Sequence, residues 1–418
     1  MAGADIRRFS IDRRGTSLNA PLAALAAALL AFADALLYPI LVLPVVVAQL
    51  TGNLTTIGLV SSLAAGLWFI PQIISAGVIQ DRRRVKPVLI VGSITRAAAF
   101  GLFTYIGFRA NDFTHQELLR WLVFTLIIAT TASAFSSLPL TIMTARSVSS
   151  DQQRRVFGGR TVLGGLLAIV AGLIVASVFD VDGPAFPRNF TLLVLAAAGA
   201  VATGGFLAGL VREPKRMSNV RIPKLGESIT GAFSAFGDRS FRRFALYRGV
   251  VALSAGVEPL LIIYGIQQLG IPLRFVGFYL IALVAGRLVA DPVWAALAAS
   301  AGHRAVLQAS TAVRIIAPGV ALVLPSIAKS SFWQDHVTNP LVNRALFGLV
   351  FLAIGIALAG QIRGSFGYID EIIPANRRFH CANMLNATLM LLAFAPVAAA
   401  SIAKDRGIGG PVVAASAY

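Results

Sequence analysis

Two long apolar runs, residues 56–79 and 87–108, flank a short basic loop, and this arrangement limits the fold more than any other feature of the sequence. Each run has about the 20 residues that an α-helix needs to cross the hydrocarbon core of a bilayer. The loop between them, residues 80–86, carries four basic side chains and is too polar to enter that core. The sequence therefore predicts a membrane-embedded helical hairpin whose basic turn lies at one membrane surface.

The composition extends this prediction to the whole chain. Of the 418 residues, 57% are hydrophobic and 13% are charged, and the mean hydropathy is +0.78. These values lie outside the range of soluble domains, so we expect an all-α integral membrane protein embedded in a lipid bilayer. The net charge of +18 does not indicate a nucleic-acid partner, because the basic residues stand in short loops between apolar runs.

The residues that would hold a metal, a cofactor or a catalytic centre are scarce. The single cysteine, Cys381, excludes an internal disulfide and a cysteine-cluster metal site. The four histidines lie in loops or at span ends and never at metal-ligand spacing: His115, His303, His336 and His380. No glycine-rich phosphate loop with a lysine is present. We expect no enzyme activity, no metal and no cofactor, so that any transport would be driven by gradients.

Hydropathy places eleven complete spans. They cover residues 22–47, 56–79, 87–108, 119–144, 158–179, 190–211, 244–269, 275–299, 305–327, 346–368 and 381–403. A last apolar run, 409–418, has about half the length of a span, so the twelfth helix is expected to be truncated in this chain. The polar segment 212–243 separates an N-terminal half, 1–211, from a C-terminal half, 244–418. Apolar residues recur in it at helical spacing, which fits either an amphipathic helix on the inner leaflet or a solvated linker.

The distribution of basic residues predicts the orientation. The N-terminal tail and the loops after spans two, four, six, eight and ten hold 23 lysines and arginines, whereas the opposite loops hold seven. Because basic loops stay in the cytoplasm, we expect a cytoplasmic N-terminus and a cytoplasmic middle segment. The expected location is an inner, or plasma, membrane of the bacterial type.

The loop after the second span resembles the signature loop of the major facilitator superfamily of transporters. The matching residues are Gly77, Asp81, Arg82, Arg84 and Lys86, while Arg83-Arg84 replaces the second glycine that the family usually carries. The resemblance covers essentially the whole chain. It implies two pseudo-repeated six-helix bundles, a central cavity lined by the first and seventh helices, and a monomer that moves a small molecule by alternating access.

The two halves repeat at the level of sequence. Lys86-Pro-Val-Leu followed by Arg96 matches Arg304-Ala-Val-Leu followed by Arg314 at the same interval, and Asp34 on the first span corresponds to Glu258 on the seventh. Transporters built from such repeats place their substrate site between the halves, near the middle of the membrane.

Charged residues inside spans are the main candidates for function, because their burial in lipid is costly. Asp34 and Glu258 fall near mid-span, where a carboxylate could bind a proton during transport or contact a cationic substrate. Alternatively, Asp34 pairs with Arg96 and Glu258 with Arg314 as salt bridges that only neutralise each other. Two aromatic candidates for the cavity wall are Tyr38 and Tyr264, although packing is the more usual role of an aromatic residue in a span.

Three further patterns suggest particular contacts. Arg287 and Asp291 are four residues apart on one span, which predicts a structural i,i+4 pair. Gly165 and Gly172 fall on one face of the fifth span, which favours close approach of another helix. At the inner end of the tenth span, Asp370, Glu371 and Arg377 could exchange partners with the signature loop as a cytoplasmic gate, or Arg377 could serve only as a positive-inside anchor.

These observations favour a secondary active transporter of a small organic solute, with protons as the coupling ion. An uncoupled facilitator or a lipid or pigment carrier of the same fold is the first alternative. The second is a membrane partner or sensor that transports nothing. The sequence does not indicate which solute is carried.

Overall fold

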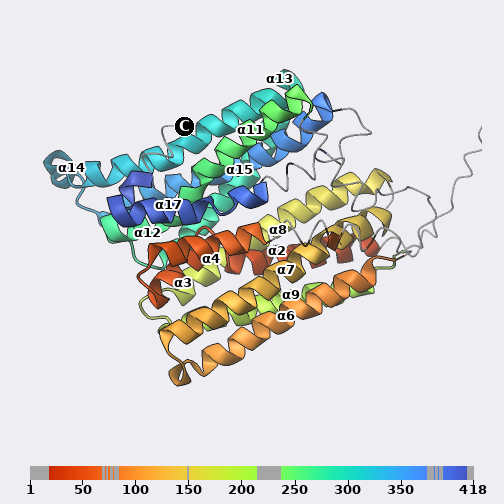
Figure 1. The fold of residues 1–418 in the computed structure, drawn as a ribbon, viewed down its shortest axis with the longest axis horizontal. Helices are drawn as coiled ribbons and strands as arrows, with labels where there is room; N and C mark the ends of the chain where they lie inside the picture. The colour runs from red at the N-terminus through yellow and green to blue at the C-terminus, as the bar shows by residue number, and fades with distance from the viewer. Residues whose placement is uncertain are drawn as a thin grey trace, which may run out of the picture.

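The structure is a computed structural model that describes residues 18–67, 71, 74–75, 79, 84–147, 150–213, 237–373, 381, 385 and 389–411. Within these residues all the regular structure is helical, as the composition predicted (Figure 1). The N-terminal half contains α2 (Asn19–Leu36), α3 (Val42–Leu50), α4 (Leu54–Gly66), α6 (Lys86–Phe108), α7 (His115–Ser147), α8 (Ser150–Val178) and α9 (Arg188–Leu210). The C-terminal half contains α11 (Arg239–Ser254), α12 (Glu258–Leu269), α13 (Phe275–Ala328), α14 (Ser331–His336), α15 (Pro340–Ile372) and α17 (Ala395–Arg406).

Eight of the helical segments in the described residues are long and apolar enough to cross a membrane. The protein is therefore an integral membrane protein. The expected number of spans is larger because α13, with 54 residues, contains two of them, 275–299 and 305–327, joined at Gly302. Of the predicted second and eleventh spans, the described residues include the shorter apolar helices Leu54–Gly66 and Leu389–Lys404. Most of the segments 212–243 and 409–418 lies outside the described residues.

The first helix of each half is interrupted near a proline, whereas the sequence predicted continuous spans over 22–47 and 244–269. Between α2 and α3 the carbonyl of Tyr38 accepts the N–H groups of Leu41, Val42 and Leu43 at 3.0–3.3 Å. Tyr38 precedes Pro39, and the residue before a proline is held away from helical geometry. In the C-terminal half a short 3₁₀ turn, Ala255–Val257, separates α11 from α12, which has Pro259 in its first turn.

The helices form two bundles that lie side by side, with the N-terminal half coloured red to yellow-green in Figure 1 and the C-terminal half green to blue. The halves contact each other most extensively where α8 packs against α13 and α4 against α17, and α12 also packs against α3 and α4. A continuous apolar core runs through both bundles and includes Leu36, Val46, Leu260 and Phe351.

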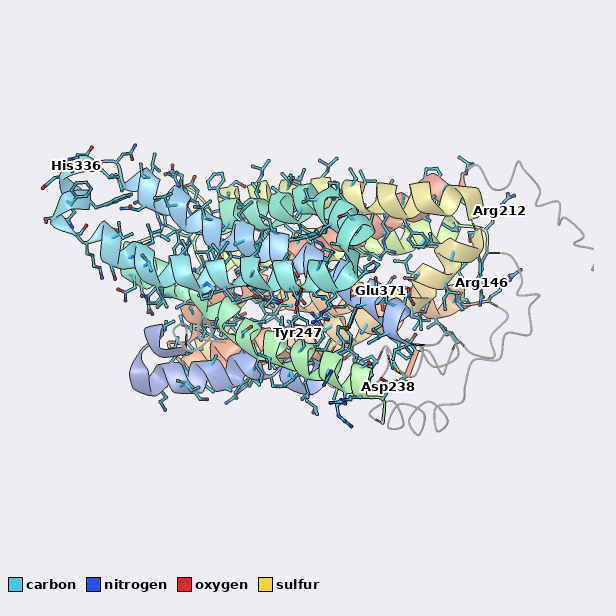
Figure 2. All side chains as sticks on the ribbon, turned by 90° about the horizontal axis from the view of Figure 1, so that it is seen from above. Arg146, Arg212, Asp238, Tyr247, His336 and Glu371 are labelled. Atoms are coloured by element: carbon cyan, nitrogen blue, oxygen red, sulfur yellow. The ribbon has the colours of Figure 1, made fainter. Side chains whose placement is uncertain are left out.

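The two ends of the bundles carry different residues. Figure 2 shows Arg146 and Arg212, at the ends of α7 and α9, near one end of the molecule and His336 of α14 at the other. We call the first the basic end and the second the opposite end. This separation matches the sequence prediction, which put the loops after the fourth and sixth spans on one side and the loop after the ninth on the other.

A prediction about α13 follows from Gly302. This residue has φ +81° and ψ 168°, a backbone conformation that an L-amino acid rarely adopts, and it allows one helix to end and the next to begin without a longer loop. We expect Gly302→Ala to destabilise the protein by about 1–2 kcal/mol, seen as a lower melting temperature in detergent. Gly101→Ala is the matched control, since a Cβ there meets nothing within 4 Å, and should be neutral or slightly stabilising. Equal melting temperatures for the two variants would contradict this account.

Candidate functional site

A cavity of about 520 Å³ lies between the two halves. Its wall is built by α2, α6, α7 and α8 of the N-terminal half and by the first span within α13 of the C-terminal half. The lining of α6 and α8 begins seven residues inside the basic end, with Ser93 and Phe157, which corresponds to a depth of about 10 Å. On α2 the lining continues from Ala27 to Tyr38. The cavity therefore occupies the middle of the molecule.

Asp34 and Arg96 meet at this cavity as a salt bridge between α2 and α6. The two side chains differ in environment, because that of Arg96 is only 7% exposed whereas that of Asp34 is 60% exposed. The Arg96 guanidinium also lies 5.4 Å from the ring centre of Phe100. The carboxylate thus faces the cavity while its partner is held inside the bundle.

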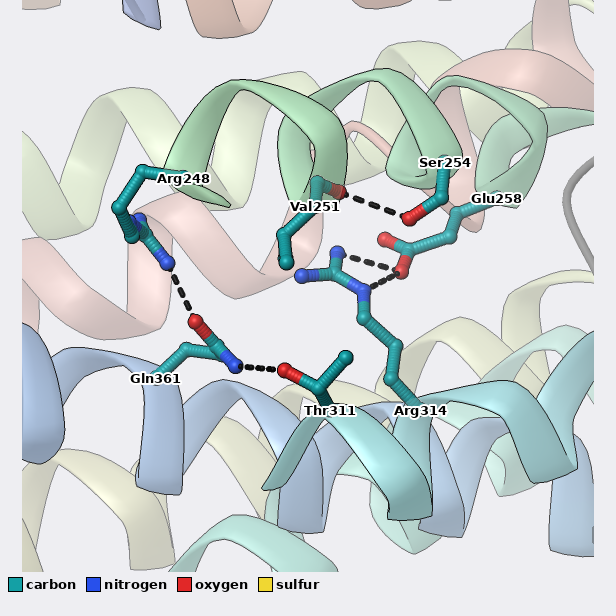
Figure 3. Close-up of polar contacts among 7 residues, drawn as sticks. All are labelled: Arg248, Val251, Ser254, Glu258, Thr311, Arg314 and Gln361. Carbon is teal, nitrogen blue, oxygen red and sulfur yellow. Dashed lines mark hydrogen bonds and ion pairs between the residues drawn. The ribbon is translucent and has the colours of Figure 1, made fainter. Parts of the chain in front are cut away.

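Glu258 and Arg314 form the equivalent pair in the C-terminal half, away from the central cavity (Figure 3). Arg314 donates from Nε and Nη2 to Glu258 Oε1 at 2.8 and 2.5 Å. Both side chains are buried, at 12% and 6% exposure. They line a hollow of only about 90 Å³, in which Thr311 also takes part. This pair is therefore closed off from the space that Asp34 faces.

The two predicted aromatic candidates differ in position. Tyr38, four residues after Asp34, lines the cavity together with Arg287. Tyr264 packs half-buried against the core, and it lines neither the cavity nor the hollow beside Glu258. Of the two tyrosines, only Tyr38 therefore lies in the wall of this cavity.

Two arginines line the cavity that sequence reasoning did not assign to it, Arg160 and Arg287. Arg160 stands at the edge of the predicted span 158–179 and is one of the 23 basic residues that the orientation count assigns to the loop before it, but α8 begins at Ser150 and carries it inside the bundle. Its position could have been found from helical spacing, since residues 157, 160, 161, 164, 165 and 168 all line the cavity.

The predicted pair between Arg287 and Asp291 is wrong. Asp291 instead accepts three hydrogen bonds of 2.8–3.2 Å from Arg363 of α15, which comes from the neighbouring span. Because Arg363 occupies both carboxylate oxygens, Arg287 projects to the cavity instead. A single-helix spacing argument could not have anticipated a partner 72 residues away.

A second hollow of about 400 Å³ shares Thr161, Arg287 and Leu288 with the central cavity. Its other lining residues include Asp291, Arg363 and His303, and His303 lies directly after the turn at Gly302. The two hollows are therefore contiguous, and together they lead from the middle of the molecule toward the basic end.

At the opposite end the halves touch. A Cβ added at Gly277 of α13 would lie 2.2 Å from the carbonyl oxygen of Gly172 on α8, and one added at Gly58 of α4 would lie 2.4 Å from the carbonyl oxygen of Pro396 on α17. Gly165 packs against Leu288 in the same crossing of α8 and α13. The close approach that the sequence predicted for Gly165 and Gly172 is thus made with α13.

Part of the predicted cytoplasmic gate lies in the described residues. Lys86 donates from Nζ to the carbonyl of Val211 at 3.0 Å, and Arg84 is exposed just before α6. Glu371 accepts from the backbone N–H and the ring Nδ1 of His303 at 3.2 and 2.6 Å, a contact within its own half. Asp370 precedes it at the end of α15, whereas Gly77, Asp81, Arg82 and Arg377 lie outside the described residues.

Glu213 organises the basic end of the N-terminal half, and sequence reasoning did not single it out. Its carboxylate is 1% exposed and accepts the backbone N–H groups of Val85 and Lys86 at 2.9–3.0 Å. A carboxylate at this position satisfies donors that the first turn of α6 leaves free. Arg146 of α7 adds a contact of 3.4 Å. Glu213 and Glu371 therefore hold the starts of corresponding helices, α6 and the second span within α13.

The described residues contain no cluster of three or more His, Cys, Asp or Glu that could hold a metal ion. Both acids of the site are instead occupied by arginines.

No family model matches the sequence, and no curated protein does so either. Solved structures do match. The nucleoside transporter NupG is 12% identical, covers 96% of each chain and gives a TM-score of 0.70. A bacterial homologue of the iron transporter ferroportin in its inward-facing state is 15% identical, covers 95% of this chain and 97% of its own, and gives 0.68. The outward-facing state of that homologue is 17% identical, covers 95% of this chain and 96% of its own, and gives a TM-score of 0.61.

This likeness establishes the fold. The chain has the two-bundle fold of the major facilitator superfamily, as its signature loop indicated. Of the two ferroportin-homologue structures, the inward-facing one gives the higher TM-score.

The glycine crossing yields a second prediction. Gly277→Ala should force α8 and α13 apart, because its Cβ would meet backbone atoms of Gly172 and Ala176, which cannot move aside like a flexible side chain. We expect the opposite end to open. Double electron–electron resonance would then give a longer distance between spin labels at Val181 and Gln267. Gly199→Ala is the control, since a Cβ there has nothing within 4 Å. An unchanged distance in Gly277→Ala would show that this crossing does not keep the end closed.

Proposed function

We propose that the protein is a secondary active transporter that moves a small organic solute across the membrane by alternating access. The observation that carries this proposal is the cavity of about 520 Å³ between two bundles whose described residues touch at the opposite end. Cavities of this size suit small ligands, and charged groups inside a bundle mark a solute or ion path. The likeness to transporters of several substrates supports the class and leaves the solute open.

In this proposal residues 1–211 and 244–418 are the two rocking halves, joined by 212–243. The basic end faces the cytoplasm of a bacterial-type inner membrane, because the loops that the sequence assigns to this side hold 22 lysines and arginines once Arg160 is excluded, against seven in the opposite loops. The conformation described above is then open to the cytoplasm. We propose that the functional unit is a monomer, since the cavity is complete within one chain.

Within the proposal, protons couple at Asp34 rather than at both repeat-related acids. The Asp34 carboxylate is mostly exposed to the cavity, so water can exchange its proton while the solute site is open. Glu258 is buried and holds two hydrogen bonds from Arg314 that protonation would weaken. Glu258 is thus assigned a structural role. Tyr38 and Arg96 complete the site around Asp34.

The pairing of Asp34 with Arg96 also favours a second candidate function, that of an uncoupled facilitator or a lipid or pigment carrier. If Asp34 only neutralises Arg96, transport needs no proton. Solute uptake by whole cells, screened with and without a protonophore, separates the two. Accumulation that the protonophore abolishes supports coupling, downhill uptake alone supports the facilitator, and no uptake of any solute would overturn the transport proposal.

Asp34→Asn tests the coupling role. An amide imitates the protonated acid but cannot release a proton, so we expect uphill accumulation to be lost while downhill exchange of solute continues. The melting temperature of the purified variant should fall less than that of Glu258→Gln, because the Asp34 side chain is 60% exposed and cavity water can replace its charge beside Arg96, whereas Glu258 is enclosed. A marked loss of stability in Asp34→Asn that the double variant with Arg96→Gln reverses would assign Asp34 to a structural pair instead.

Glu258→Gln tests the structural role of the buried pair. Removing this charge leaves Arg314 uncompensated at 12% exposure, which should cost about 3–5 kcal/mol and lower expression and melting temperature. The double variant Glu258→Gln with Arg314→Gln should recover much of that loss. A stable single variant that has lost only uphill accumulation would contradict the assignment and place Glu258 in the coupling machinery.

A further inference from the structure

The charges around the central cavity do not balance. One carboxylate, Asp34, faces three guanidinium groups, those of Arg96, Arg160 and Arg287. Asp34 and Arg96 neutralise each other as a salt bridge. Among the described residues no carboxylate lies within salt-bridge distance of Arg160 or Arg287. The cavity thus keeps two positive charges that the described part of the chain does not compensate.

Three described acids of the C-terminal half have other partners. Asp291, one turn from Arg287, is taken by Arg363 through both carboxylate oxygens. Glu258 is taken by Arg314 and Glu371 by His303. A cationic side chain inside a bundle is costly unless it is paired or serves a solute path, so two such arginines on one cavity indicate a site for a negative group.

The two arginines come from opposite halves. Arg160 lies on α8 and Arg287 on α13, the helices that cross at Gly165, Leu288 and Gly172. An anion bound between them would contact both halves at once. Arginine offers a planar fork of donors that binds carboxylate or phosphate oxygens in pairs, so this chemistry suits either group.

The other residues of the cavity wall favour a solute that is a small, polar anion. Ser136 and Thr161 donate their hydroxyl protons to the backbone carbonyls of Ala132 and Phe157, which leaves oxygen lone pairs to accept from a solute. A volume of about 520 Å³ has room for an organic acid or a sugar phosphate. Asp34 would repel an anionic solute only weakly, since its charge is already paired with that of Arg96.

We infer that the solute of this protein is a small organic anion, bound through its carboxylate or phosphate group by Arg160 and Arg287. The inference rests on the proposed transport function, because it names the class of solute that the same cavity carries. Binding to Arg160 and Arg287 together also requires the halves to keep their present approach at α8 and α13.

Binding is measured first, by the melting temperature of the purified full chain in detergent. Gluconate and glycerol 3-phosphate supply the two anionic groups, inorganic phosphate is the inorganic probe, glucose and uridine are neutral, and choline is cationic. Binding to the folded state raises the melting temperature. We expect at least one organic anion to raise it in a saturable way, and glucose, uridine and choline to have no effect. The probe that binds, gluconate, glycerol 3-phosphate or phosphate alone, identifies the recognised group.

Arg160→Gln and Arg287→Gln should each weaken that binding on the order of 10- to 100-fold, since each removes a charge-assisted contact. Arg109→Gln is the matched control. Arg109 is an exposed residue that directly follows α6, it stacks on Tyr105, and it does not line the cavity. Its binding should equal that of the parent. If either cavity variant fails to fold, the lysine variants Arg160→Lys and Arg287→Lys, which keep the charge, replace it and should weaken binding less.

Uptake into proteoliposomes then separates the two proposals. An anion that binds through the arginines but is not taken up would overturn the transport function and leave the anion site standing. Uptake of a neutral or cationic solute that Arg160→Gln and Arg287→Gln leave unchanged would overturn the anion site and leave transport standing. Stabilisation by organic anions that both arginine variants retain would also overturn it.

Discussion

The cost of placing a charge inside an apolar bundle governs the arrangement of this protein. Three arginines each form a salt bridge with a carboxylate from a neighbouring helix, namely Arg96, Arg314 and Arg363. Glu213 accepts hydrogen bonds from the backbone at the start of α6 and also contacts Arg146. Each of these contacts joins elements far apart in sequence, so the charges fix which helices lie together as well as neutralising one another. Arg160 and Arg287 have no such partner among the described carboxylates and lie on the cavity, whereas Arg248 donates to Gln361 instead. The two arginines without a partner on the cavity wall therefore mark the central cavity between the halves.

Contacts between the halves depend on close packing at glycines more than on charge pairs. Apolar side chains gain little free energy by leaving lipid for another helix. The halves are joined where glycine lets backbones approach, at Gly172 with Gly277 and at Gly58 with Pro396. Such crossings bury few polar groups, so separating them breaks mainly van der Waals contacts. A joint of this kind suits alternating access, because it holds one end closed without a large interaction energy that rocking would have to overcome.

Much of the fold could be predicted from the sequence because the bilayer sets both the length and the polarity of each element. The spans, the membrane location and the superfamily fold followed from hydropathy and from the loop that contains Lys86. Interruptions were harder to predict: Pro39 and Pro259 were visible, yet whether a proline bends or breaks a helix depends on what accepts the freed N–H groups, here the carbonyl of Tyr38. The candidate site was predicted in part, since the repeat pointed to Asp34 with Arg96, whereas Arg160 was assigned to a loop and Arg287 to the wrong partner. Both errors have one physical source, because pairing is decided by helices that pack in space and sequence spacing reports only one helix at a time.

The sequence repeat gives each half one acid–arginine pair, but the two pairs differ in how deeply they are buried. Asp34 and Glu258 occupy equivalent positions and each meets the arginine that its own half supplies. In the C-terminal half Gln361 donates to Thr311 and accepts from Arg248, so polar contacts fill the space beside Arg314 (Figure 3). In the N-terminal half the corresponding space is open, and α13 of the other half completes its wall with Leu283, Val284 and Arg287. The same pair is thus locked in one half and accessible in the other. A carboxylate that meets solvent on one side and a buried arginine on the other can respond to a solute, whereas one that is enclosed can only hold its helices together.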